Sequence, residues 1–330
     1  MPTILRFPKK NFYRLRIPIS MTLVSEMNER ELIEDFKSFI HTEGKIGPGD
    51  DAAVLSDGTV ASTDIVSFDR HFPAGMTYEQ FGWYAAAVSF SDIASMGARP
   101  TGFLAALALP GNLDKQNAYD IMSGIDQCCE YCGTGIIGGD TKPGPGIVTG
   151  TALGKMDGRK PMLRTGAHPD DVICITGPLG GPAAALVDIE YGLGLEQSRD
   201  CLYVPIPRIA EGISMAESGA VTSCMDLSDG LGTALNTICG QSHTGATVEW
   251  DFLPKNEYAV KASELTGTSL EQLLFDCGGE YELLFTADKN KLERLYDSEF
   301  EFHVIGMIND SGRTELIKNG ERRAIGYGRY

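Results

Sequence analysis

The chain reads QFGWYAAAVSFSDIASMGA at residues 80–98, and Asp92 carries the only charge in this stretch. The other residues are apolar or small, Thr77 and Gln80 form a capping-box pattern at the start, and Gly97 is a typical helix end. The stretch therefore predicts a long helix that is buried on most of its surface. A carboxylate in mid-helix cannot cap it, and a buried ionised carboxylate costs several kcal/mol unless it is paired or holds a metal. We interpret Asp92 as a functional residue.

Two further stretches isolate carboxylates in the same way. Asp140 and one lysine carry the only charges in residues 131–154, and Asp226 and Asp229 carry the only charges in residues 218–248. Aspartate is also common in turns and at helix starts, so a structural role for Asp226 or Asp229 is an alternative to a catalytic one.

These aspartates belong to a larger acidic set that has few basic residues near it in sequence. The set has seven carboxylates, accompanied by only Lys142 and Arg164: Asp50, Asp51, Asp64, Asp92, Asp140, Asp226 and Asp229. So much negative charge at one site requires cations. Oxygen ligands without cysteine or histidine favour Mg²⁺ or Ca²⁺. Since Mg²⁺ usually takes one or two carboxylates and fills its shell with water and phosphate oxygens, several Mg²⁺ ions that bridge a nucleotide fit the set.

The sequence lacks the common nucleotide-binding motifs. Gly154-Lys155 is followed by Met156, so there is no Walker pattern, and neither a GxGxxG turn nor a protein-kinase HRD or DFG motif occurs. Glycine-bearing turns such as Asp229-Gly230 present N–H groups that suit phosphate, although such turns are common. The sequence indicates phosphate chemistry without a P-loop.

Composition and charge exclude several classes of protein. The chain has 330 residues, of which 42% are apolar and 22% charged, and a formal net charge of −17. These values predict a folded protein of two domains and disfavour a nucleic-acid partner. No apolar run approaches the roughly 20 residues of a membrane helix, so no membrane partner is expected. The eight cysteines lack the spacing of a secreted disulfide scaffold, which predicts a cytoplasmic location. We interpret Cys129-x-x-Cys132 as core filler, with zinc or redox chemistry as the alternative.

The alternation of apolar patterns predicts an α+β fold in two parts that meet at the turn Asp157-Gly158. Residues 1–25 are basic and lack the apolar core of a signal peptide, so we interpret them as a tail or an over-long start. Helices are expected at residues 28–44, 77–97, 114–132, 183–191, 207–218, 231–242, 257–265 and 289–298. Strands are expected at residues 52–55, 59–66, 103–109, 135–138, 147–154, 172–176, 221–225, 247–252, 281–286 and 302–308.

Six motifs in a fixed order carry a resemblance to a known family. They are Gly49-Asp-Asp-Ala-Ala-Val54, Ser62-Thr-Asp64, Ser91-Asp92 with Met96-Gly-Ala98, Gly138-Gly-Asp140, Gly158-Arg159 with Arg164-Thr-Gly166, and Asp226-Leu-Ser-Asp-Gly230. From about residue 26 to 330 the chain resembles thiamine-monophosphate kinases, which belong to the ATP-binding superfamily of aminoimidazole ribonucleotide synthetase. The resemblance implies an N-terminal domain, residues 26–156, that binds ATP and several Mg²⁺ ions and pairs through its sheet in a homodimer. It also implies a C-terminal α/β domain, residues 157–330, that completes the active site.

The resemblance implies a role for each matched position. The implied metal ligands are Asp51, Ser62, Thr63, Asp64, Asp92, Asp140, Asp226 and Asp229, and the implied ATP contacts are Gly139, Asp140, Arg164 and Ser228. The implied substrate contacts are His71, Glu280 and Tyr327, and the implied catalytic residues are Asp92, Asp140, Arg164 and Asp229. The segment Gly278-Gly-Glu-Tyr-Glu-Leu283 is one residue shorter than the family's Gly-Gly-Glu-Asp-Tyr-Glu-Leu, so Gly279 is an alternative to Glu280.

The reaction that the resemblance implies is ATP-dependent phosphorylation of thiamine monophosphate to thiamine diphosphate. A phosphate monoester is already an anion at neutral pH, so it needs no catalytic base. Metal ions and Arg164 would neutralise and align the two polyanions for direct in-line transfer. The alternatives are another ATP-dependent synthetase of the superfamily and a non-catalytic nucleotide- or metal-binding regulator. The absence of cysteine before Cys128 and from the C-terminal tail disfavours selenophosphate synthetase and hydrogenase-maturation relatives.

Overall fold

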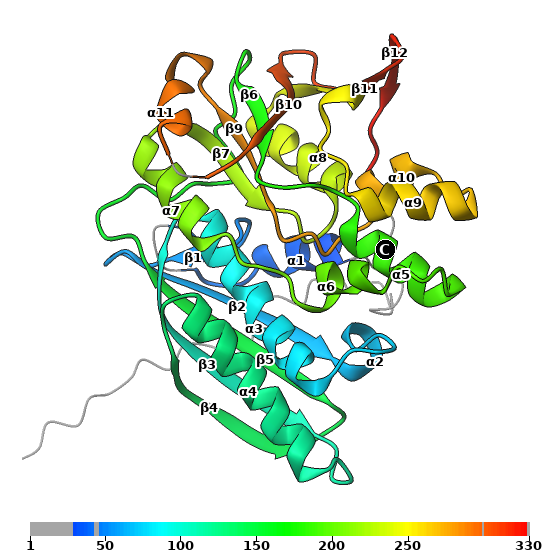
Figure 1. Cartoon of the computed structure of the whole chain (residues 1–330). Helices are drawn as coiled ribbons and strands as arrows, with labels where there is room; N and C mark the ends of the chain where they lie inside the picture. The colour runs from blue at the N-terminus through cyan, green and yellow to red at the C-terminus, as the bar shows by residue number, and fades with distance from the viewer. Residues whose placement is uncertain (1–28, 43–45, 299, 329–330) are drawn as a thin grey trace, which may run out of the picture. The chain divides into compact units, whose positions relative to one another are not determined.

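The computed structural model describes residues 29–42, 46–298 and 300–328 (Figure 1). The chain divides into two compact units, Met1–Glu43 and Gly44–Tyr330. The described part of the first unit contains helix α1 (Glu29–Lys37), where a helix was predicted. The predicted tail, residues 1–25, and the predicted helix ends at Asn28 and Gly44 lie outside the described residues. The second unit contains two mixed sheets with their helices.

The first sheet has five strands in the order β1-β2-β5-β3-β4. Strands β3 and β4 are parallel, and all other neighbours are antiparallel. The strands are β1 (Ala53–Val54), β2 (Thr59–Ser67), β3 (Arg99–Leu109), β4 (Ile136–Pro143) and β5 (Ile147–Lys155). The helices of this part are α2 (Phe68–His71), α3 (Tyr78–Ser95) and α4 (Lys115–Tyr131).

The second sheet has seven strands in the order β12-β11-β8-β10-β6-β9-β7, and β11 and β8 are its one parallel pair. Its strands are β6 (Val172–Ile175), β7 (Val221–Asp226), β8 (Gly245–Glu249), β9 (Leu283–Ala287), β10 (His303–Asn309), β11 (Thr314–Lys318) and β12 (Glu321–Ala324). The helices are α5 (Gly181–Tyr191), α6 (Arg199–Tyr203), α7 (Ile209–Ser218), α8 (Leu231–Ser242), α9 (Glu257–Thr266), α10 (Leu270–Phe275) and α11 (Glu293–Tyr296). Helices α5, α8, α9 and α10 share one core with the sheet, and α7 and α11 share another.

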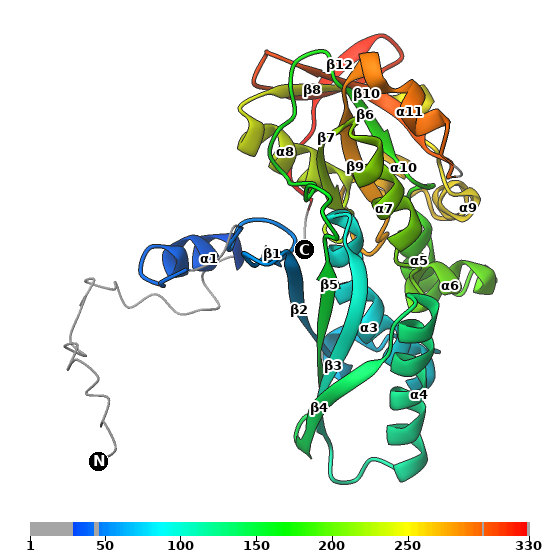
Figure 2. The same ribbon diagram turned by 90° about the vertical axis from the view of Figure 1, so that its left-hand side faces the viewer.

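The two faces of the first sheet differ. Alternate residues of a strand point to opposite faces, and in β2 the side chains of Val60 and Val66 are buried whereas Ile65 is 67% exposed. Helices α3 and α4 lie together on one side of the sheet (Figure 2). On β4, Ile137 is 59% exposed. Within residues 46–328, the face opposite these helices is open and partly apolar.

Helix α3 begins and ends where its sequence predicts. The hydroxyl of Thr77 accepts the N–H of Gln80, and the Gln80 side chain accepts the N–H of Thr77, which completes the capping box. Most of the helix is buried, including Phe81, Phe90 and Ile93. The predicted buried helix is therefore confirmed.

Glycines hold α3 close to its neighbours. A Cβ on Gly82 would lie 1.9 Å from the carbonyl oxygen of Ile121 in α4, and a Cβ on Gly212 in α7 would lie 2.0 Å from the carbonyl oxygen of Ala94. No side chain fits at either position, so the backbones approach directly. Because α7 belongs to the second sheet, this contact sets the position of Asp92 relative to that sheet.

Several short segments differ from the predicted elements. The predicted strand 247–252 stops at Glu249 and turns into a 3₁₀-helix, Trp250–Phe252, whose carbonyl at Trp250 accepts a hydrogen bond from Lys255 Nζ at 2.7 Å. The predicted helix 289–298 is broken into a 3₁₀ turn and α11, because the Asp288 side chain caps the N–H of Asn290 and starts a tighter turn. The short helices α2, α6 and α10 and the terminal strands β11 and β12 were not predicted.

The eight cysteines all carry free thiols. Cys128, Cys129 and Cys132 are buried in the core of the first sheet and its helices. Burial raises the pKa of Cys129 to about 12, so its thiol stays protonated at neutral pH. These observations favour the core-filler interpretation. Among the described helices, none combines the length and the apolar character needed to cross a bilayer.

Candidate active site

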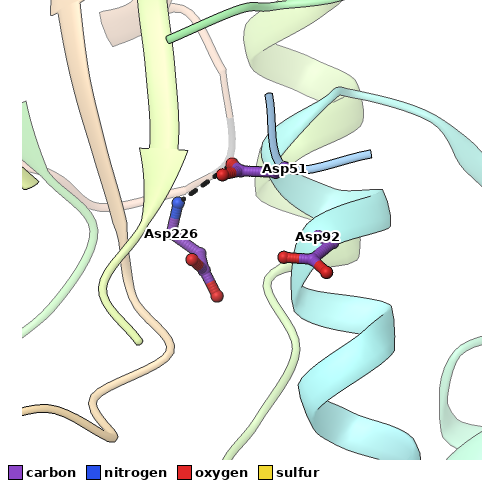
Figure 3. Close-up of side chains that lie close together, drawn as sticks. All are labelled: Asp51, Asp92 and Asp226. Carbon is purple, nitrogen blue, oxygen red and sulfur yellow. Dashed lines mark hydrogen bonds between the residues drawn. The ribbon is translucent and has the colours of Figure 1, made fainter. Parts of the chain in front are cut away.

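Three carboxylates converge where the first sheet's helix α3 meets the second sheet (Figure 3). Asp51 lies in the loop before β1, Asp92 lies in α3, and Asp226 ends β7. One carboxylate oxygen of each lies within 4.8 Å of the other two. The main-chain N–H of Asp226 donates to Asp51 Oδ2 at 3.3 Å. We refer to Asp51, Asp92 and Asp226 as the acidic cluster.

Serine hydroxyls hold the carboxylates of the acidic cluster. Ser62 of β2 donates a short hydrogen bond to Asp92 Oδ2. Ser91 donates to Asp226 Oδ2 at 2.7 Å, and Ser228 donates to Asp226 Oδ1 at 3.0 Å. Since Ser91 precedes Asp92 in α3, this helix supplies both a carboxylate and the hydroxyl that orients its neighbour.

Burial and mutual repulsion disfavour the ionised forms of Asp92 and Asp226. Burial, together with the Asp51 charge, raises the pKa of Asp226 to about 7. Burial also raises the pKa of Asp92 well above its ordinary value, and the charges of Asp226, Asp64 and Asp51 raise it further. A bound cation would reverse both effects, because it favours the ionised carboxylates.

Arg164 is the positive group at the acidic cluster. Its Nε and Nη2 atoms lie 2.6 Å and 2.5 Å from Asp51 Oδ1, and its main-chain N–H donates to Asp50 Oδ1 at 2.8 Å. The Asp51 side chain is 0% exposed, whereas that of Arg164 is 26% exposed. Burial lowers the pKa of Arg164, but the neighbouring carboxylates outweigh burial and leave it raised. The guanidinium therefore stays charged at the edge of the cluster.

The residue types of the acidic cluster fit Mg²⁺. The converging atoms are carboxylate oxygens, with the hydroxyls of Ser62, Ser91 and Ser228 beside them, and such hard oxygen ligands are those that Mg²⁺ prefers. Asp64 lies on the same face of β2 as Ser62, two residues further along the strand.

Thr63 points to the other face of β2. Its hydroxyl donates to the carbonyl oxygen of Gly150 at 2.9 Å and lies 2.9 Å from Thr151 Oγ1. The side chain of Thr63 therefore points away from the face of β2 that carries Ser62.

The structure does not bring Asp140 to the acidic cluster. Asp140 lies on the edge strand β4, in register with Ala106 of β3, and its exposed carboxylate pairs with Lys142 Nζ at 2.9 Å. Three strand spacings separate β4 from β2, which is about 14 Å. The adjacent Gly139 has a φ of +155°, and a Cβ there would lie 1.8 Å from the carbonyl oxygen of Ala105. Glycine is required at this position for close strand packing.

The loop after β7 is bound to the segment before β9. The N–H of Gly279 donates to the carbonyl of Ser228 at 2.9 Å, and the N–H of Glu280 donates to the carbonyl of Leu227 at 3.1 Å. The structure thus places Ser228 and Asp229 beside residues 278–280. A Cβ on Gly278 would lie 3.2 Å from the Cα of Asp229, so glycine allows this approach.

The predicted substrate residues lie at three places. His71 ends α2, and its Nδ1 accepts the N–H of Ser67 at 3.1 Å. The Glu280 carboxylate accepts the N–H of Gly180 at the start of α5, and burial raises its pKa to about 8. Tyr327 lies in the C-terminal segment and is 58% exposed.

Residues 49–156 match the family described as AIR synthase related protein, N-terminal domain, and residues 168–319 match its C-terminal domain. A thiamine-monophosphate kinase of Methanopyrus kandleri is 30% identical over 300 residues, which cover 90% of this chain and 94% of that protein. The chain belongs to the thiamine-monophosphate kinase family.

Solved structures agree with membership of the thiamine-monophosphate kinase family. The thiamine-monophosphate kinase from Stenotrophomonas maltophilia K279a is 30% identical in sequence, and its structure has a TM-score of 0.72. The match covers 88% of this chain and 95% of that chain. The structure described as AaThiL complexed with AMPPCP and TMP has a TM-score of 0.80 and is 24% identical in sequence. The match covers 92% of this chain and 97% of that chain, so the two proteins share the same fold. The predicted family and its two mixed α/β domains are confirmed.

Three residues of this thiamine-monophosphate kinase family member, Ser91, Tyr84 and Tyr281, were given no role from sequence. Ser91 orients Asp226, and the hydroxyls of Tyr84 and Tyr281 lie 2.9 Å apart beside the acidic cluster. Tyr84 lies eight residues before Asp92 in α3, which is the spacing of one helix face. This spacing could have indicated that Tyr84 lies on the same face of the helix as Asp92. No pattern in the sequence around Tyr281 indicates that its side chain faces Tyr84.

Proposed function

We propose that this chain transfers a phosphoryl group from ATP to thiamine monophosphate and so forms thiamine diphosphate. The acidic cluster carries the proposal, because three carboxylates from segments far apart in sequence converge beside Arg164. The names of the relatives support the substrate, and the related structure that holds AMPPCP and TMP supports the pair of ligands. The enzyme would act on two anions, a nucleotide and a phosphate monoester.

Asp51, Asp92 and Asp226 would hold Mg²⁺, with Ser62, Asp64 and Asp229 as further ligands of several ions. When bound, Mg²⁺ would neutralise phosphate charge and favour in-line transfer. Asp92 and Asp226 would then be ionised, and the hydroxyls of Ser62 and Ser91 would keep their carboxylates oriented. Asp140 and Gly139 remain predicted nucleotide contacts, on the exposed strand β4.

Arg164 and Ser228 are the proposed protein contacts to the nucleotide phosphates. The guanidinium of Arg164 is charged at the edge of the cluster and presents several N–H donors in a plane, which suits phosphate oxygens. The acceptor phosphate is ionised at neutral pH, so the protein need not remove a proton from it. Its phosphate oxygen would attack the γ-phosphorus directly, and no phosphoenzyme would form.

His71, Glu280 and Tyr327 are the proposed contacts to the acceptor. Because His71 Nδ1 accepts a hydrogen bond and burial lowers its pKa, the neutral ring carries its proton on Nε2 and can donate it. Burial keeps Glu280 protonated below about pH 8, so it too offers a proton to a polar atom of the acceptor. Tyr327 would stack on the thiamine pyrimidine.

A homodimer is the proposed assembly. The open face of the first sheet exposes Ile65 (67%), Ile137 (59%) and Leu104 (36%), and a second copy of this face would cover them. Light scattering should give twice the mass of the chain, and Ile137→Asp should lower it to a monomer. A wild-type monomer would contradict the assembly. The eight free thiols support the proposed cytoplasmic location.

One assay tests the function. Purified protein is incubated with ATP and Mg²⁺ and with thiamine monophosphate, thiamine, aminoimidazole precursors, or no acceptor, and thiamine diphosphate and ADP are measured. We expect turnover only with thiamine monophosphate, and its loss in Asp92→Asn. Equal phosphorylation of thiamine would contradict the assignment. Turnover with a precursor would favour another synthetase, and no turnover with any acceptor would favour a regulator.

A further inference from the structure

Two tyrosine hydroxyls meet beside the acidic cluster, and the transfer described above does not use them. Tyr84 of α3 and Tyr281 before β9 lie 197 residues apart in sequence, and their hydroxyl oxygens are 2.9 Å apart. Their rings meet edge to face, with centroids 5.9 Å apart. The main-chain N–H of Tyr281 donates to the carbonyl of Leu227, the residue after Asp226, and Tyr84 lies in the same helix as Asp92. The tyrosine pair thus belongs to the surroundings of the proposed metal ligands.

The backbone around Tyr281 is arranged to aim this side chain at Tyr84. Tyr281 has a φ of +52°, a conformation that bulky residues rarely adopt outside functional sites. Its N–H and that of Glu280 both donate to the carbonyl of Leu227, at 3.2 Å and 3.1 Å, which fixes the turn. Three consecutive side chains consequently point in different directions: Glu280 bonds to Gly180, Tyr281 to Tyr84, and Glu282 to both Arg208 and Thr176.

The ring of His71 lies next to that of Tyr84. The two ring centroids are 6.1 Å apart with an angle of 33° between the planes. A continuous row therefore runs from His71 through Tyr84 to Tyr281, and its far end adjoins Glu280 in the chain. The row joins two of the three residues proposed for the acceptor, and Tyr281 bonds to Leu227, the neighbour of Asp226.

The tyrosine pair has one proton to give to a third group. Two hydroxyls carry two protons, and the hydrogen bond between them uses one. A neutral donor of this kind suits an attacking phosphate, because it orients an oxygen without cancelling the negative charge that makes the oxygen nucleophilic. The raised pKa values mean that both hydroxyls stay protonated at neutral pH.

We propose that Tyr84 and Tyr281 are acceptor-binding residues whose paired hydroxyls hydrogen-bond the phosphate of the acceptor, between the metal ligands and His71. This inference rests on the proposed function, and it adds two residues and a location to it. The pair holds the acceptor's phosphate at the acidic cluster while Tyr327 and Glu280 bind the rest of the molecule.

The test removes the hydroxyls one at a time. Tyr84→Phe, Tyr281→Phe and the double variant are compared with Tyr203→Phe, a control whose buried hydroxyl donates to the carbonyl of Ala74 at 2.6 Å, away from the cluster. The measurements are kcat, KM for ATP, KM for thiamine monophosphate, the calorimetric Kd of thiamine monophosphate, and Tm. We expect each single variant to raise KM and Kd for thiamine monophosphate by about tenfold or more, with kcat and KM for ATP unchanged. The double variant should bind thiamine monophosphate more weakly than either single variant, because each single variant keeps one hydroxyl and its proton.

The control should keep wild-type KM for thiamine monophosphate, whatever its Tm. Wild-type acceptor KM and Kd in both single variants would overturn the inference. A parallel rise of both KM values together with a lower Tm would also overturn it, because it would show that the pair only ties the two sheets together. If the wild type binds thiamine monophosphate without phosphorylating it, the proposed function is wrong. The Kd values would still test the role of the tyrosine pair in that case. A wild type that neither binds nor phosphorylates it would overturn both.

Discussion

The guanidinium of Arg164 contacts a single carboxylate oxygen, Asp51 Oδ1, through both Nε at 2.6 Å and Nη2 at 2.5 Å. The other oxygen of Asp51 accepts the main-chain N–H of Asp226. Asp51 therefore connects Arg164 to Asp226. A fully buried carboxylate depends strongly on such partners, because its charge has no water to stabilise it.

Arg164→Met should lower both stability and activity. Removal of one partner of a buried ion pair typically costs about 3–5 kcal/mol, and we expect kcat to fall by about 100-fold or more. Mg²⁺ should restore part of the lost stability, because it replaces the missing positive charge beside Asp51. The control is Arg199→Met, since Arg199 is 29% exposed and pairs with Asp188, whose side chain is 0% exposed. Urea unfolding with and without Mg²⁺ measures the difference, and equal recovery of both variants would contradict a role for Arg164 at a metal site.

Without divalent cations, stability should fall as the pH rises from about 4 to about 7. Asp226 has a pKa of about 7 when folded against an ordinary value of 3.8, so the folded protein binds more protons than the unfolded chain between these values. The full loss from this group is on the order of 4 kcal/mol, and it levels off above about pH 7. Unfolding free energies in EDTA at several pH values measure it, with Asp226→Asn as the variant in which the fall should be smaller. A wild-type curve that is already flat over this range would refute the argument.

Asp92→Asn should match or exceed wild-type stability in the absence of metal. The carboxylate is disfavoured there by burial and by Asp226, Asp64 and Asp51, and the amide removes that repulsion. With Mg²⁺ and ATP the order should reverse, and turnover should be largely lost. Asp188→Asn is the control, because it breaks the ion pair with Arg199 and should lower Tm under both conditions. An Asp92 variant that melts lower in every buffer, or keeps full activity, would mark Asp92 as a structural residue.

Asp140→Asn tests the predicted residue that the structure leaves on the edge of the sheet. If Asp140 binds nucleotide or metal, kcat should fall by about 100-fold or more without a change in Tm. Asp57→Asn provides a matched control, since Asp57 is 63% exposed and pairs with Lys155 at 2.9 Å, just as Asp140 is 60% exposed and pairs with Lys142. Equal, near wild-type kinetics in both variants would remove Asp140 from the site.

Tyr327→Ala should weaken acceptor binding alone. Loss of an aromatic stacking contact costs about 1 kcal/mol, which corresponds to roughly a fivefold higher KM for thiamine monophosphate. The KM for ATP should not change. Tyr296→Ala serves as the control, because Tyr296 is similarly exposed but stacks on Phe302 in the second sheet's outer layer. Unchanged acceptor KM in the Tyr327 variant would place the C-terminal segment outside the acceptor site.

Local patterns predicted the elements that they control. The capping box at Thr77 and the apolar run after it gave the limits of α3 within one or two residues. The Asp57-Gly58 turn gave the hairpin of β1 and β2, whose register pairs Ala53 with Ala61. Strands β11 and β12 were missed because neither has an alternating apolar pattern, and β12 is exposed throughout. Their strand pairing depends on neighbours that lie far away in sequence.

The site was also only partly predictable, because its residues are brought together by contacts between segments far apart in sequence. The isolated charges of Asp92 and Asp226 indicated functional carboxylates, and the structure places them together with Asp51. Which of the other acidic residues lie near them depends on sheet order, and this order leaves Asp140 three strands from β2. The contact of Tyr84 with Tyr281 depends on a turn with positive φ at one end and a helix face at the other. No pattern within either segment specifies that contact.

The hydrogen bond between Asp226 and Asp51 also constrains how the protein is made. It joins residues 175 positions apart. At about 5–20 residues per second, a ribosome needs roughly 9 to 35 s to add the second partner after the first. During that interval the nascent chain contains Asp51, Asp64 and Asp92 but not β7, and the segment that holds Tyr281 arrives later still. Every translation product that stops before this segment therefore lacks the assembled site, even if its first sheet has already folded.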